Sequence, residues 1–333
     1  MIECDTQQLF ILAIGALGLG MYMLLRGGGW TVDAAVFVAR RLGISPLVIG
    51  FTVVAMGTSL PELIVSINAN MVGSAGIVTG NVIGSNIANI LFVLGVTAFY
   101  TTLTVLPRAL MRDLVMMMFA TLLMMGFMLY GDITRLAGMS MIAIIFSYVF
   151  WQYWLARKGK IDVEDMEEPQ FKSMVPAVGF LIAGLACIAL GAEFLVRGAK
   201  VTATIIGVPE DVIGLSVIAL GTSLPELSTC LIAAMKRHTD IVIGNIVGSN
   251  VFNILLIIGV TALVKPIQQA EIAPQVISLD IWVMFAVSAI FTVILLLYRK
   301  LNRGIGILFI LAYILYISAI YGLYLGRDLI PQG

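Results

Sequence analysis

Residues 48–95 read "VIGFTVVAMGTSLPELIVSINANMVGSAGIVTGNVIGSNIANILFVLG", and this stretch decides how the chain folds. Almost every residue in it is apolar, yet Pro61 and Glu62 stand side by side within it, among several Ser, Thr and Asn residues. An acid and a proline are both unusual inside a long apolar segment. The same combination returns later in the chain almost letter for letter, so the pattern requires a physical explanation.

The composition indicates a membrane protein. Of the 333 residues, 60% are hydrophobic and 11% are charged, whereas a soluble domain carries about 25% charged residues. Equal numbers of basic and acidic residues, 19 each, give no reason to expect nucleic acid as a partner. The N-terminus, "MIECDTQQLF", is acidic rather than basic, so we interpret the first apolar segment as a retained membrane helix and not as a cleaved signal peptide.

Hydrophobic runs bounded by charges, Gly or Pro predict ten membrane-spanning helices, because about 20 residues of helix are needed to cross a bilayer core of about 30 Å. The expected spans are 8–25, 46–70, 76–99, 112–130, 137–156, 174–194, 211–235, 240–264, 278–298 and 305–325. The polar stretch "RKGKIDVEDMEEPQFK" separates the fifth from the sixth. We therefore expect a first five-helix repeat at 1–156, a cytoplasmic linker at 157–173 and a second repeat at 174–333.

The two halves repeat each other. "GTSLPEL" at 57–63 recurs unchanged at 221–227. At the same sequence offset, "GNVIGSN" and "NILFVLGVTA" of the first half become "GNIVGSN" and "NILLIIGVTA". This matching indicates an internal duplication, with the repeated motifs at 57–95 and 221–259. Because each repeat has an odd number of helices, the two repeats are expected to have opposite orientations in the membrane.

The distribution of basic residues predicts the orientation of the chain. With the N-terminus outside, 14 Lys and Arg residues fall on the cytoplasmic side and five on the other. This bias follows the positive-inside rule. It favours ten helices with both termini extracytoplasmic, and the short loops indicate a plasma (inner) membrane. The predicted fold class is an all-α polytopic membrane protein of two inverted five-helix repeats, with broken helices at the midplane.

The prolines explain how a glutamate can be tolerated at membrane depth. Pro61 and Pro225 have no amide hydrogen to donate to the carbonyl four residues back. Each helix is therefore expected to break beside its glutamate, Glu62 or Glu226, and to leave carbonyl oxygens free just before the break. Thr58 lies one helical turn before Glu62 on the same face. A broken backbone is tolerated in a membrane where it lines a site.

The helix that follows each break carries a polar stripe. The stripe residues are spaced by four, so each trio shares one helix face. They are Asn81, Ser85 and Asn89 in the first half, and Asn245, Ser249 and Asn253 in the second. Since inverted repeats meet near the midplane, we expect both glutamates and both stripes to face each other rather than the lipid.

Carboxylates, hydroxyls, amides and backbone carbonyls are hard oxygen ligands, the set that Ca²⁺ prefers. His238 falls in a predicted cytoplasmic loop, and neither Cys187 nor Cys230 belongs to a stripe, so Zn²⁺ and Cu⁺ are not expected. The methionines at 115–128 are interpreted as core or lipid-facing filler. Two carboxylates would balance one Ca²⁺, two Na⁺ or two protons. An empty site would leave two buried charges unpaired, which favours exchange over uniport.

Two other classes of protein compete with a carrier. An intramembrane hydrolase would need a nucleophile with a His or paired-Asp partner inside the membrane, and none is evident in the sequence. A channel would also place polar residues in the membrane, but inverted repeats with discontinuous helices are typical of carriers.

"GTSLPE" twice, each time followed by "GNxxGSN", resembles the α-repeats of the Ca²⁺/cation antiporter superfamily, specifically those of prokaryotic sodium/calcium exchangers. The resemblance covers nearly the whole chain. It implies exchange of Ca²⁺ for Na⁺ by alternating access, with the ions as substrates, no cofactor, no enzymatic activity and no obligatory protein partner. It also implies that the first and sixth helices slide past the rest. A H⁺/Ca²⁺ or K⁺-dependent antiporter remains the alternative, because protons also neutralise the glutamates.

The resemblance also implies a ligand set, carried over position by position. The side chains are Glu62, Glu226, Thr58, Thr222, Ser59, Ser223, Ser85, Ser249, Asn89 and Asn253, and the backbone carbonyls are those of Ala55 and Ala219. Certain exchangers have an aspartate where this chain has Asn253. The asparagine removes a titratable group and makes the two halves of the site more alike.

Overall fold

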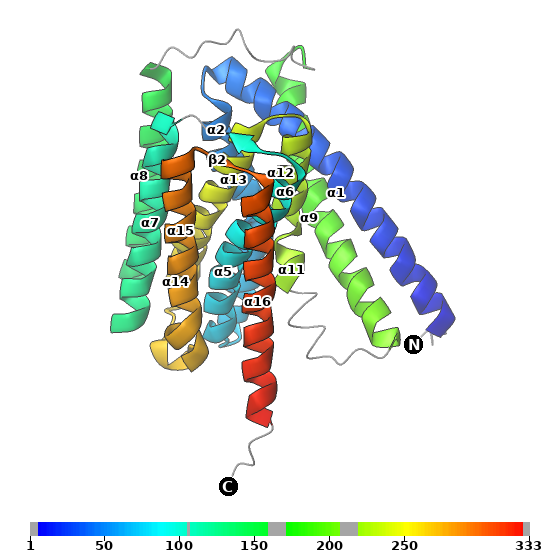
Figure 1. Ribbon diagram of the computed structural model, residues 1–333, viewed down its shortest axis with the longest axis vertical. Helices are drawn as coiled ribbons and strands as arrows, with labels where there is room; N and C mark the ends of the chain where they lie inside the picture. Colours follow the sequence, from blue (N-terminus) through cyan, green and yellow to red (C-terminus); the bar gives the residue numbers. More distant parts are fainter. Residues whose placement is uncertain (1–5, 105–106, 159–170, 207–218, 329–333) are drawn as a thin grey trace.

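A computed structural model describes residues 6–104, 107–158, 171–206 and 219–328 (Figure 1). The first half consists of α1 (Thr6–Leu42), α2 (Pro46–Ile49), η1 (Gly50–Val54), α3 (Ala55–Thr58), α4 (Leu60–Met71), α5 (Ala75–Ala88), η2 (Asn89–Val93), α6 (Leu94–Tyr100), β1 (Leu103–Thr104), α7 (Pro107–Tyr130) and α8 (Arg135–Lys158). The second half consists of α9 (Met174–Ile205), α11 (Ala219–Thr222), α12 (Leu224–Met235), α13 (Thr239–Phe252), η5 (Asn253–Ile258), α14 (Gly259–Val264), η6 (Gln269–Glu271), η7 (Val276–Asp280), α15 (Ile281–Tyr298), β2 (Lys300–Leu301) and α16 (Arg303–Asp328).

The predicted all-α polytopic membrane fold is confirmed. Among the described residues, eight helices are long and apolar enough to cross a membrane, and the bent pair Pro46–Thr58 and Leu60–Met71 makes a ninth span. The expected span at 211–235 is described only from Ala219 onward, where α12 is a shorter apolar helix. Ten spans arranged as two inverted repeats are consistent with this architecture.

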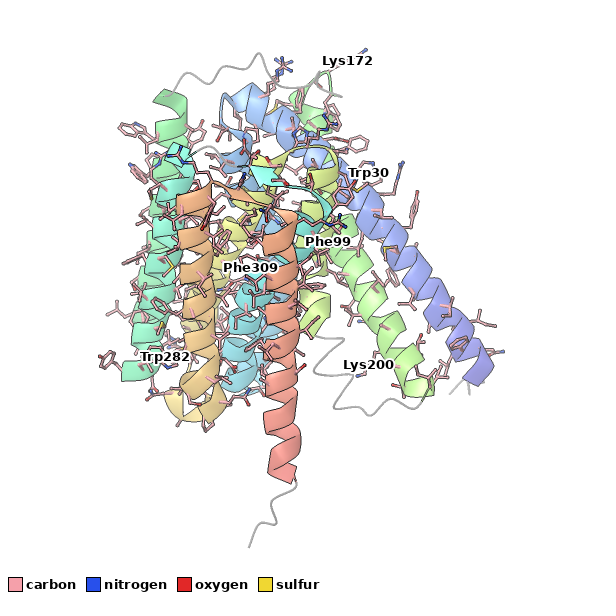
Figure 2. All side chains as sticks on the ribbon, in the orientation of Figure 1. Trp30, Phe99, Lys172, Lys200, Trp282 and Phe309 are labelled. Carbon is pink, nitrogen blue, oxygen red and sulfur yellow. The ribbon has the colours of Figure 1, made fainter. Side chains whose placement is uncertain are left out.

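The outer surface of the bundle is apolar. Large side chains such as Leu12, Leu297 and Leu315 are 64%, 71% and 71% exposed, and side chains of this kind project from the helices in Figure 2. Lipid tails solvate such side chains as well as a protein core does. Polar residues are instead found inside, where the helices meet.

The first and sixth spans are longer than the sequence predicts. Helix α1 has 37 residues and α9 has 32, whereas 8–25 and 174–194 were expected. At about 1.5 Å per residue, α1 is about 55 Å long. Arg26 and the following glycines do not end α1. The Arg26 guanidinium lies 5.9 Å from the centroid of the Trp30 ring, Gly27 packs against α9, and Gly28 packs against Ser228 and Ile232 of α12.

Helices α1 and α9 form an antiparallel pair held by glycines (Figure 1). A Cβ atom on Gly20 would lie 2.6 Å from the carbonyl oxygen of Gly191, and one on Gly27 would lie 2.7 Å from that of Gly184. A third contact, between Gly198 and α1, follows two turns further along α9. We call this line of contacts the glycine seam. Such close backbone approach favours association of helices in lipid.

Helix α1 is also joined to the second repeat. The Ser228 hydroxyl donates to the carbonyl of Leu24 over 2.8 Å, and Lys236 forms an ion pair with Asp33. The side chains of Lys236 and Asp33 are 31% and 16% exposed. The pair formed by α1 and α9 is therefore attached to α12 at Ser228 and to the residue that follows α12, Lys236.

Helix α13 packs closely on the first repeat. A Cβ atom on Gly244 would lie 2.4 Å from the Leu47 carbonyl oxygen, and one on Gly248 would lie 2.3 Å from that of Phe51. The GxxxG spacing in this half therefore serves close helix packing. The positions that match 47–51 in the second repeat, 211–215, lie outside the described residues.

Short contacts close both ends of the bundle. Strands β1 and β2 pair in antiparallel register, with Leu103 opposite Leu301. Near them, the Arg303 guanidinium lies 4.4 Å from the centroid of the Phe99 ring (Figure 2). An isolated bridge joins Ile133 to Ile267. These contacts connect loops that are far apart in sequence and hold the helices around the buried centre.

Candidate ion-binding site

Both helices that carry the glutamates are broken, as the sequence predicts. Helix α3 ends at Thr58 and α4 begins at Leu60, with a bend of 43° between the two parts. In the second repeat α11 ends at Thr222 and α12 begins at Leu224. The serine at each break is followed two residues later by proline, which cannot continue the hydrogen-bond pattern. Each glutamate therefore lies in the first turn of its second half-helix.

The Ala55 carbonyl is not free, contrary to the expectation. It accepts the Ser59 amide over 3.1 Å and the Thr58 hydroxyl over 3.2 Å. Pro61 removes only the bond to Gly57, so the last turn of α3 still closes on Ala55. Ala219, the matching residue, is the first residue of α11.

The two glutamates lie together at the centre of the bundle. Glu62 is 1% exposed and Glu226 is 0% exposed, and the two carboxylates are close enough to repel each other electrostatically. The Ser59 hydroxyl donates to Oε1 of Glu226 over 3.4 Å, which links the two repeats. One oxygen of each carboxylate, Oε2, is buried without a hydrogen-bond partner among the described residues.

The break in the first repeat meets the polar stripe of the second. The Thr58 hydroxyl lies 3.4 Å from Oγ of Ser249 and 3.4 Å from Oδ1 of Asn245. Thr58 and Ser249 also interact electrostatically with the Glu226 carboxylate. Close packing of α13 against the first repeat at Gly248 brings these groups within reach of one another. Hydroxyls from both repeats thus surround one carboxylate.

The two terminal asparagines of the stripes are bonded across the repeat interface. Nδ2 of Asn89 donates to Oδ1 of Asn250 over 3.2 Å, and Nδ2 of Asn253 donates to Oδ1 of Asn86 over 3.1 Å. The side-chain oxygens of Asn89 and Asn253 are buried without partners in the part of the chain that the structure describes. Sequence reasoning missed Asn86 and Asn250. The signal was present, because these residues end the two "GNxxGSN" motifs.

The remaining predicted ligands differ in burial. Ser85 is 4% exposed, Ser249 and Ser223 are 0% exposed, and Thr222 is half-buried. Oγ of Ser223 is a further buried oxygen with no partner in the described ranges. The second break is thus less enclosed at Thr222 than the first is at Thr58, which is 1% exposed.

The first residue of each stripe holds helices together. Nδ2 of Asn81 donates to the Glu62 backbone carbonyl over 3.3 Å and to the Ser66 hydroxyl over 3.0 Å. Nδ2 of Asn245 donates to the sulfur of Cys230 over 3.4 Å. Cys230, which is not itself a stripe residue, therefore contacts a stripe, because α12 packs directly on α13.

These groups form a buried, oxygen-rich site suited to a hard cation. Within the described residues, no group of three or more His, Cys, Asp or Glu side chains could hold a metal ion. A cation at the glutamates would therefore also need hydroxyl, amide or backbone oxygens, which are the ligands of Ca²⁺ and Na⁺ rather than of Zn²⁺ or Cu⁺. The unpartnered oxygens of Glu62, Glu226, Ser223, Asn89 and Asn253 fit that need.

Comparison with known proteins identifies the family. The family described as "Sodium/calcium exchanger protein" matches residues 12–154 and 176–322. The inner membrane protein YrbG of Escherichia coli is 34% identical over 323 residues, which cover 94% of this chain and 98% of YrbG. The sodium/calcium exchanger MaX1 of Methanosarcina acetivorans is 30% identical over 341 residues, with 91% and 97% covered.

The fold is also similar to a solved structure, that of the sodium-calcium exchanger NCX_Mj. The TM-score is 0.80 at 31% identity, over 92% of this chain and 98% of NCX_Mj. The family match and the fold thus show a multi-pass membrane transporter rather than an enzyme. The chain belongs to the sodium/calcium exchanger family and is a membrane antiporter of that family. The recognition of the family from its repeated motifs is confirmed.

Proposed function

We propose that this antiporter exchanges Ca²⁺ for Na⁺ by alternating access at a single site between Glu62 and Glu226. The observation that carries the proposal is the pair of fully buried carboxylates, one from each repeat, each with one unpartnered oxygen among the described residues. Membership of the family and the printed names of MaX1 and NCX_Mj support this choice of ions.

Charge balance explains why the protein exchanges Ca²⁺ for a counter-ion instead of transporting Ca²⁺ alone. Two carboxylates neutralise one Ca²⁺ or two Na⁺, so both loaded forms of the site are neutral. An empty site leaves two like charges in a medium of low dielectric, where an unpaired buried charge is costly. The loaded protein therefore switches sides readily and the empty protein does so slowly. Ca²⁺ movement in one direction then requires Na⁺ movement in the other.

The proposed ligands come equally from both repeats. They are Glu62, Thr58, Ser59, Ser85, Asn89 and the carbonyl of Ala55 from the first, and Glu226, Thr222, Ser223, Ser249, Asn253 and the carbonyl of Ala219 from the second. For the Ala55 carbonyl to bind an ion, the Thr58 hydroxyl that now donates to it would have to turn away. That rotation frees the Thr58 hydroxyl oxygen and leaves the Ala55 carbonyl bonded only to the Ser59 amide, with a second lone pair available to the same cation.

The proposed setting is a plasma (inner) membrane with both termini extracytoplasmic. The two inverted repeats, 1–156 and 174–333, are joined by the linker at 157–173, and the lipid bilayer is the only partner that the function needs besides its ions. The internal sequence repeat and the excess of Lys and Arg on one side support this arrangement.

Uptake of radiolabelled Ca²⁺ into proteoliposomes tests the proposal. The vesicles are loaded with Na⁺, then with K⁺ at the same pH, and then given a pH gradient alone. We expect uptake only with an outward Na⁺ gradient. Uptake that also needs internal K⁺ would identify a K⁺-dependent exchanger, and uptake driven by the pH gradient alone would identify a H⁺/Ca²⁺ antiporter. Efficient uptake with no counter-ion inside would contradict exchange altogether.

A further inference from the structure

The asparagines at the centre of the bundle have a fixed direction. An asparagine side chain presents an oxygen at one end and an NH₂ group at the other, and only the oxygen can bind a cation. The NH₂ group of Asn89 is held by Oδ1 of Asn250 at 3.2 Å. The oxygen of Asn89 must then point away from Asn250, and it is buried without a partner among the described residues.

A methionine fixes the direction of Asn250 in turn. Nδ2 of Asn250 lies 3.9 Å from the sulfur of Met117, which belongs to α7. A thioether sulfur accepts hydrogen bonds weakly and never donates them, so it can face only the NH₂ end of the amide. The oxygen of Asn250 is thereby turned toward Asn89. Met117, which the sequence analysis interpreted as filler, is therefore the first of three residues that orient one another in turn: Met117, Asn250 and Asn89. We call such a chain of three residues a relay.

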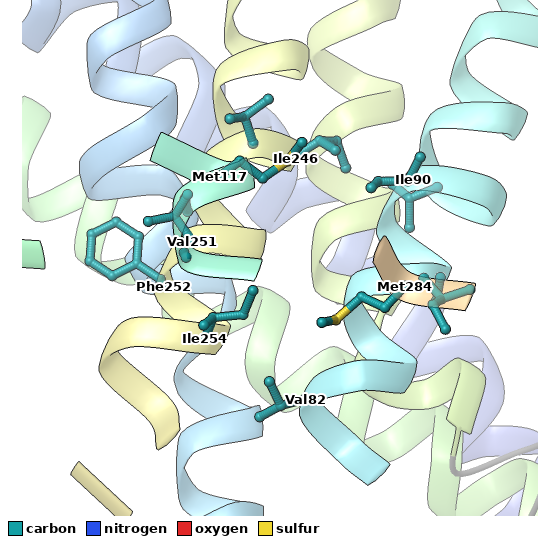
Figure 3. Close-up of a cluster of buried hydrophobic side chains, with 14 of the residues drawn as sticks. Val82, Ile90, Met117, Ile246, Val251, Phe252, Ile254 and Met284 are labelled. Carbon is teal, nitrogen blue, oxygen red and sulfur yellow. The ribbon is translucent and has the colours of Figure 1, made fainter. Parts of the chain in front are cut away.

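The same relay occurs in the other half. Nδ2 of Asn86 lies 3.6 Å from the sulfur of Met284 and also donates to the backbone carbonyl of Asn250 over 3.4 Å, and Oδ1 of Asn86 accepts Nδ2 of Asn253 over 3.1 Å. Both methionines lie among the buried side chains drawn in Figure 3, Met117 on α7 and Met284 on α15. Asn86 and Asn250 occupy matching positions in the two sequence repeats, as do Asn89 and Asn253. Each relay crosses from one repeat to the other.

We propose that Asn86 and Asn250, backed by Met284 and Met117, are positioning residues that hold the oxygen ends of Asn253 and Asn89 toward the transported cation. They do not touch the ion themselves. Without them each ligand amide can turn over and present its NH₂ group, which repels a cation. This inference rests on the proposed function, because it assigns the relays to the ion site of the exchanger.

A double-mutant cycle separates positioning from simple structural support. In the otherwise unaltered protein, we expect Asn250→Leu to raise the Ca²⁺ dissociation constant about tenfold, the effect of losing one buried ligand. In a protein that already carries Asn89→Asp, the same change should have less than about a twofold effect. A carboxylate presents an oxygen whichever way it is turned, so it needs no orienting partner. A purely structural role for Asn250 would give the same loss in both backgrounds and would overturn the proposal.

Binding is measured on the purified, detergent-solubilised protein from the rise of its unfolding temperature with Ca²⁺ concentration. Na⁺-driven uptake into vesicles is measured in parallel. If the unaltered protein binds Ca²⁺ but a Na⁺ gradient drives no uptake, the proposed function is wrong. The double-mutant cycle on Ca²⁺ binding then still tests whether Asn250 orients Asn89. If it binds no Ca²⁺, both fail.

Two further variants keep the result interpretable if Asn250→Leu unfolds the protein. Met117→Leu preserves side-chain volume but removes the sulfur acceptor, and should raise the dissociation constant about two- to threefold because the acceptor is weak. Asn70→Leu is the matched control. Asn70 is a fully buried asparagine whose amide donates to the backbone carbonyls of Thr261 and Lys265, away from the ion site. A loss of Ca²⁺ affinity in Asn70→Leu equal to that in Asn250→Leu, or an unchanged affinity in Met117→Leu, would count against the relay.

Discussion

Glu62 and Glu226 supply the negative charge of the proposed site, and their removal should stop exchange. Glutamine has the same shape as glutamate but no charge, so Glu62→Gln or Glu226→Gln leaves a bound Ca²⁺ with uncompensated positive charge in a buried place. We expect Na⁺-driven Ca²⁺ uptake to fall roughly 100-fold or more in either variant, from the energy of an unpaired buried charge. The unfolding temperature should hold or rise, since a repelling pair is relieved. Retained transport in both variants would contradict the site.

Thr58 and Thr97 offer a matched pair of buried threonines. Each hydroxyl donates to a backbone carbonyl of its own helix, Thr58 to Ala55 over 3.2 Å and Thr97 to Val93 over 2.7 Å. Only Thr58 also lies beside Ser249. We expect Thr58→Val to raise the Michaelis constant for Ca²⁺ about five- to tenfold, the effect of a lost buried polar contact, and Thr97→Val to leave it unchanged. Equal constants in transport assays would mean that Thr58 is not a ligand.

At the scale of residues, the sequence predicted which side chains come together but not how they are oriented. Spacing by four placed Asn81, Ser85 and Asn89 on one face, since helical periodicity alone determines that. The direction of the Asn89 amide depends instead on Asn250, a residue of the other repeat. The contact between Asn245 and Cys230 likewise depends on how α12 packs on α13. Such contacts between helices leave no regular spacing in a sequence.

At the scale of elements, the breaks were predictable and the long helices were not. Proline beside glutamate requires a break whatever surrounds it, and both breaks are present. The length of α1 depends on its neighbours, because Gly27 and Gly28 would end a helix in isolation but allow close contact when α9 packs against Gly27 and α12 packs against Gly28. A glycine in a membrane helix is thus ambiguous until its neighbour is known.

The glycine seam predicts a position-specific effect within one helix. Gly20→Ala places a Cβ atom 2.6 Å from the carbonyl oxygen of Gly191, so the backbones must separate. We expect it to lower the free energy of unfolding by about 1–3 kcal/mol, the usual effect of overpacking. Gly18→Ala is the control, because Gly18 is exposed and a Cβ there meets nothing within 4 Å. Thermal unfolding of the two variants in detergent checks this, and equal stabilities would contradict a close seam.

At the scale of the whole molecule, the predicted orientation can be tested with single cysteines. Gln268 and Lys300 are exposed and lie on opposite sides of α15 in the sequence, Gln268 in the loop before it and Lys300 in β2 just after it. If both termini are extracytoplasmic, Gln268→Cys should react with a membrane-impermeant maleimide in intact cells, and Lys300→Cys should react only after the membrane is opened. The unaltered protein gives the background from native cysteines. Reversed labelling would invert the topology.

The duplication predicts that the chain can be divided. Helix α1 packs on α9, and α13 packs on α2 and η1, so each half completes the other. We expect residues 1–158 and 171–333, produced together as two chains, to catalyse Na⁺-driven Ca²⁺ uptake, and either half alone to give none. Transport by one half would show that a single repeat holds a working site.

The inverted repeat was the part of the fold most fully visible in the sequence, because a constant offset between matching motifs needs no knowledge of packing. The family followed from the same repeated motifs. The sequence did not show that the break in the first half is more deeply buried than the break in the second. Enclosure of Thr58 but only half-burial of Thr222 depends on the particular arrangement of helices in this conformation.

The ion pair between Asp33 and Lys236 makes the two halves unequal. Suppose that each repeat takes the place of the other, so that every residue moves to the matching position in the other half. Gly20 then takes the place of Gly184, and Gly27 that of Gly191, so the glycine seam is unchanged. The same operation places Arg197 and Val72 where Asp33 and Lys236 stand, and that pair cannot attract.

If the opposite-facing state arises by exchange of the two repeats, it therefore keeps the seam and loses this ion pair. A partly exposed ion pair contributes about 0.5–1 kcal/mol, which corresponds to a two- to fivefold population ratio at about 0.6 kcal/mol of thermal energy. In a membrane at rest, most copies of the protein would then have their ion site open to the same side. In this respect a nearly symmetric molecule has a preferred direction in which to begin each cycle.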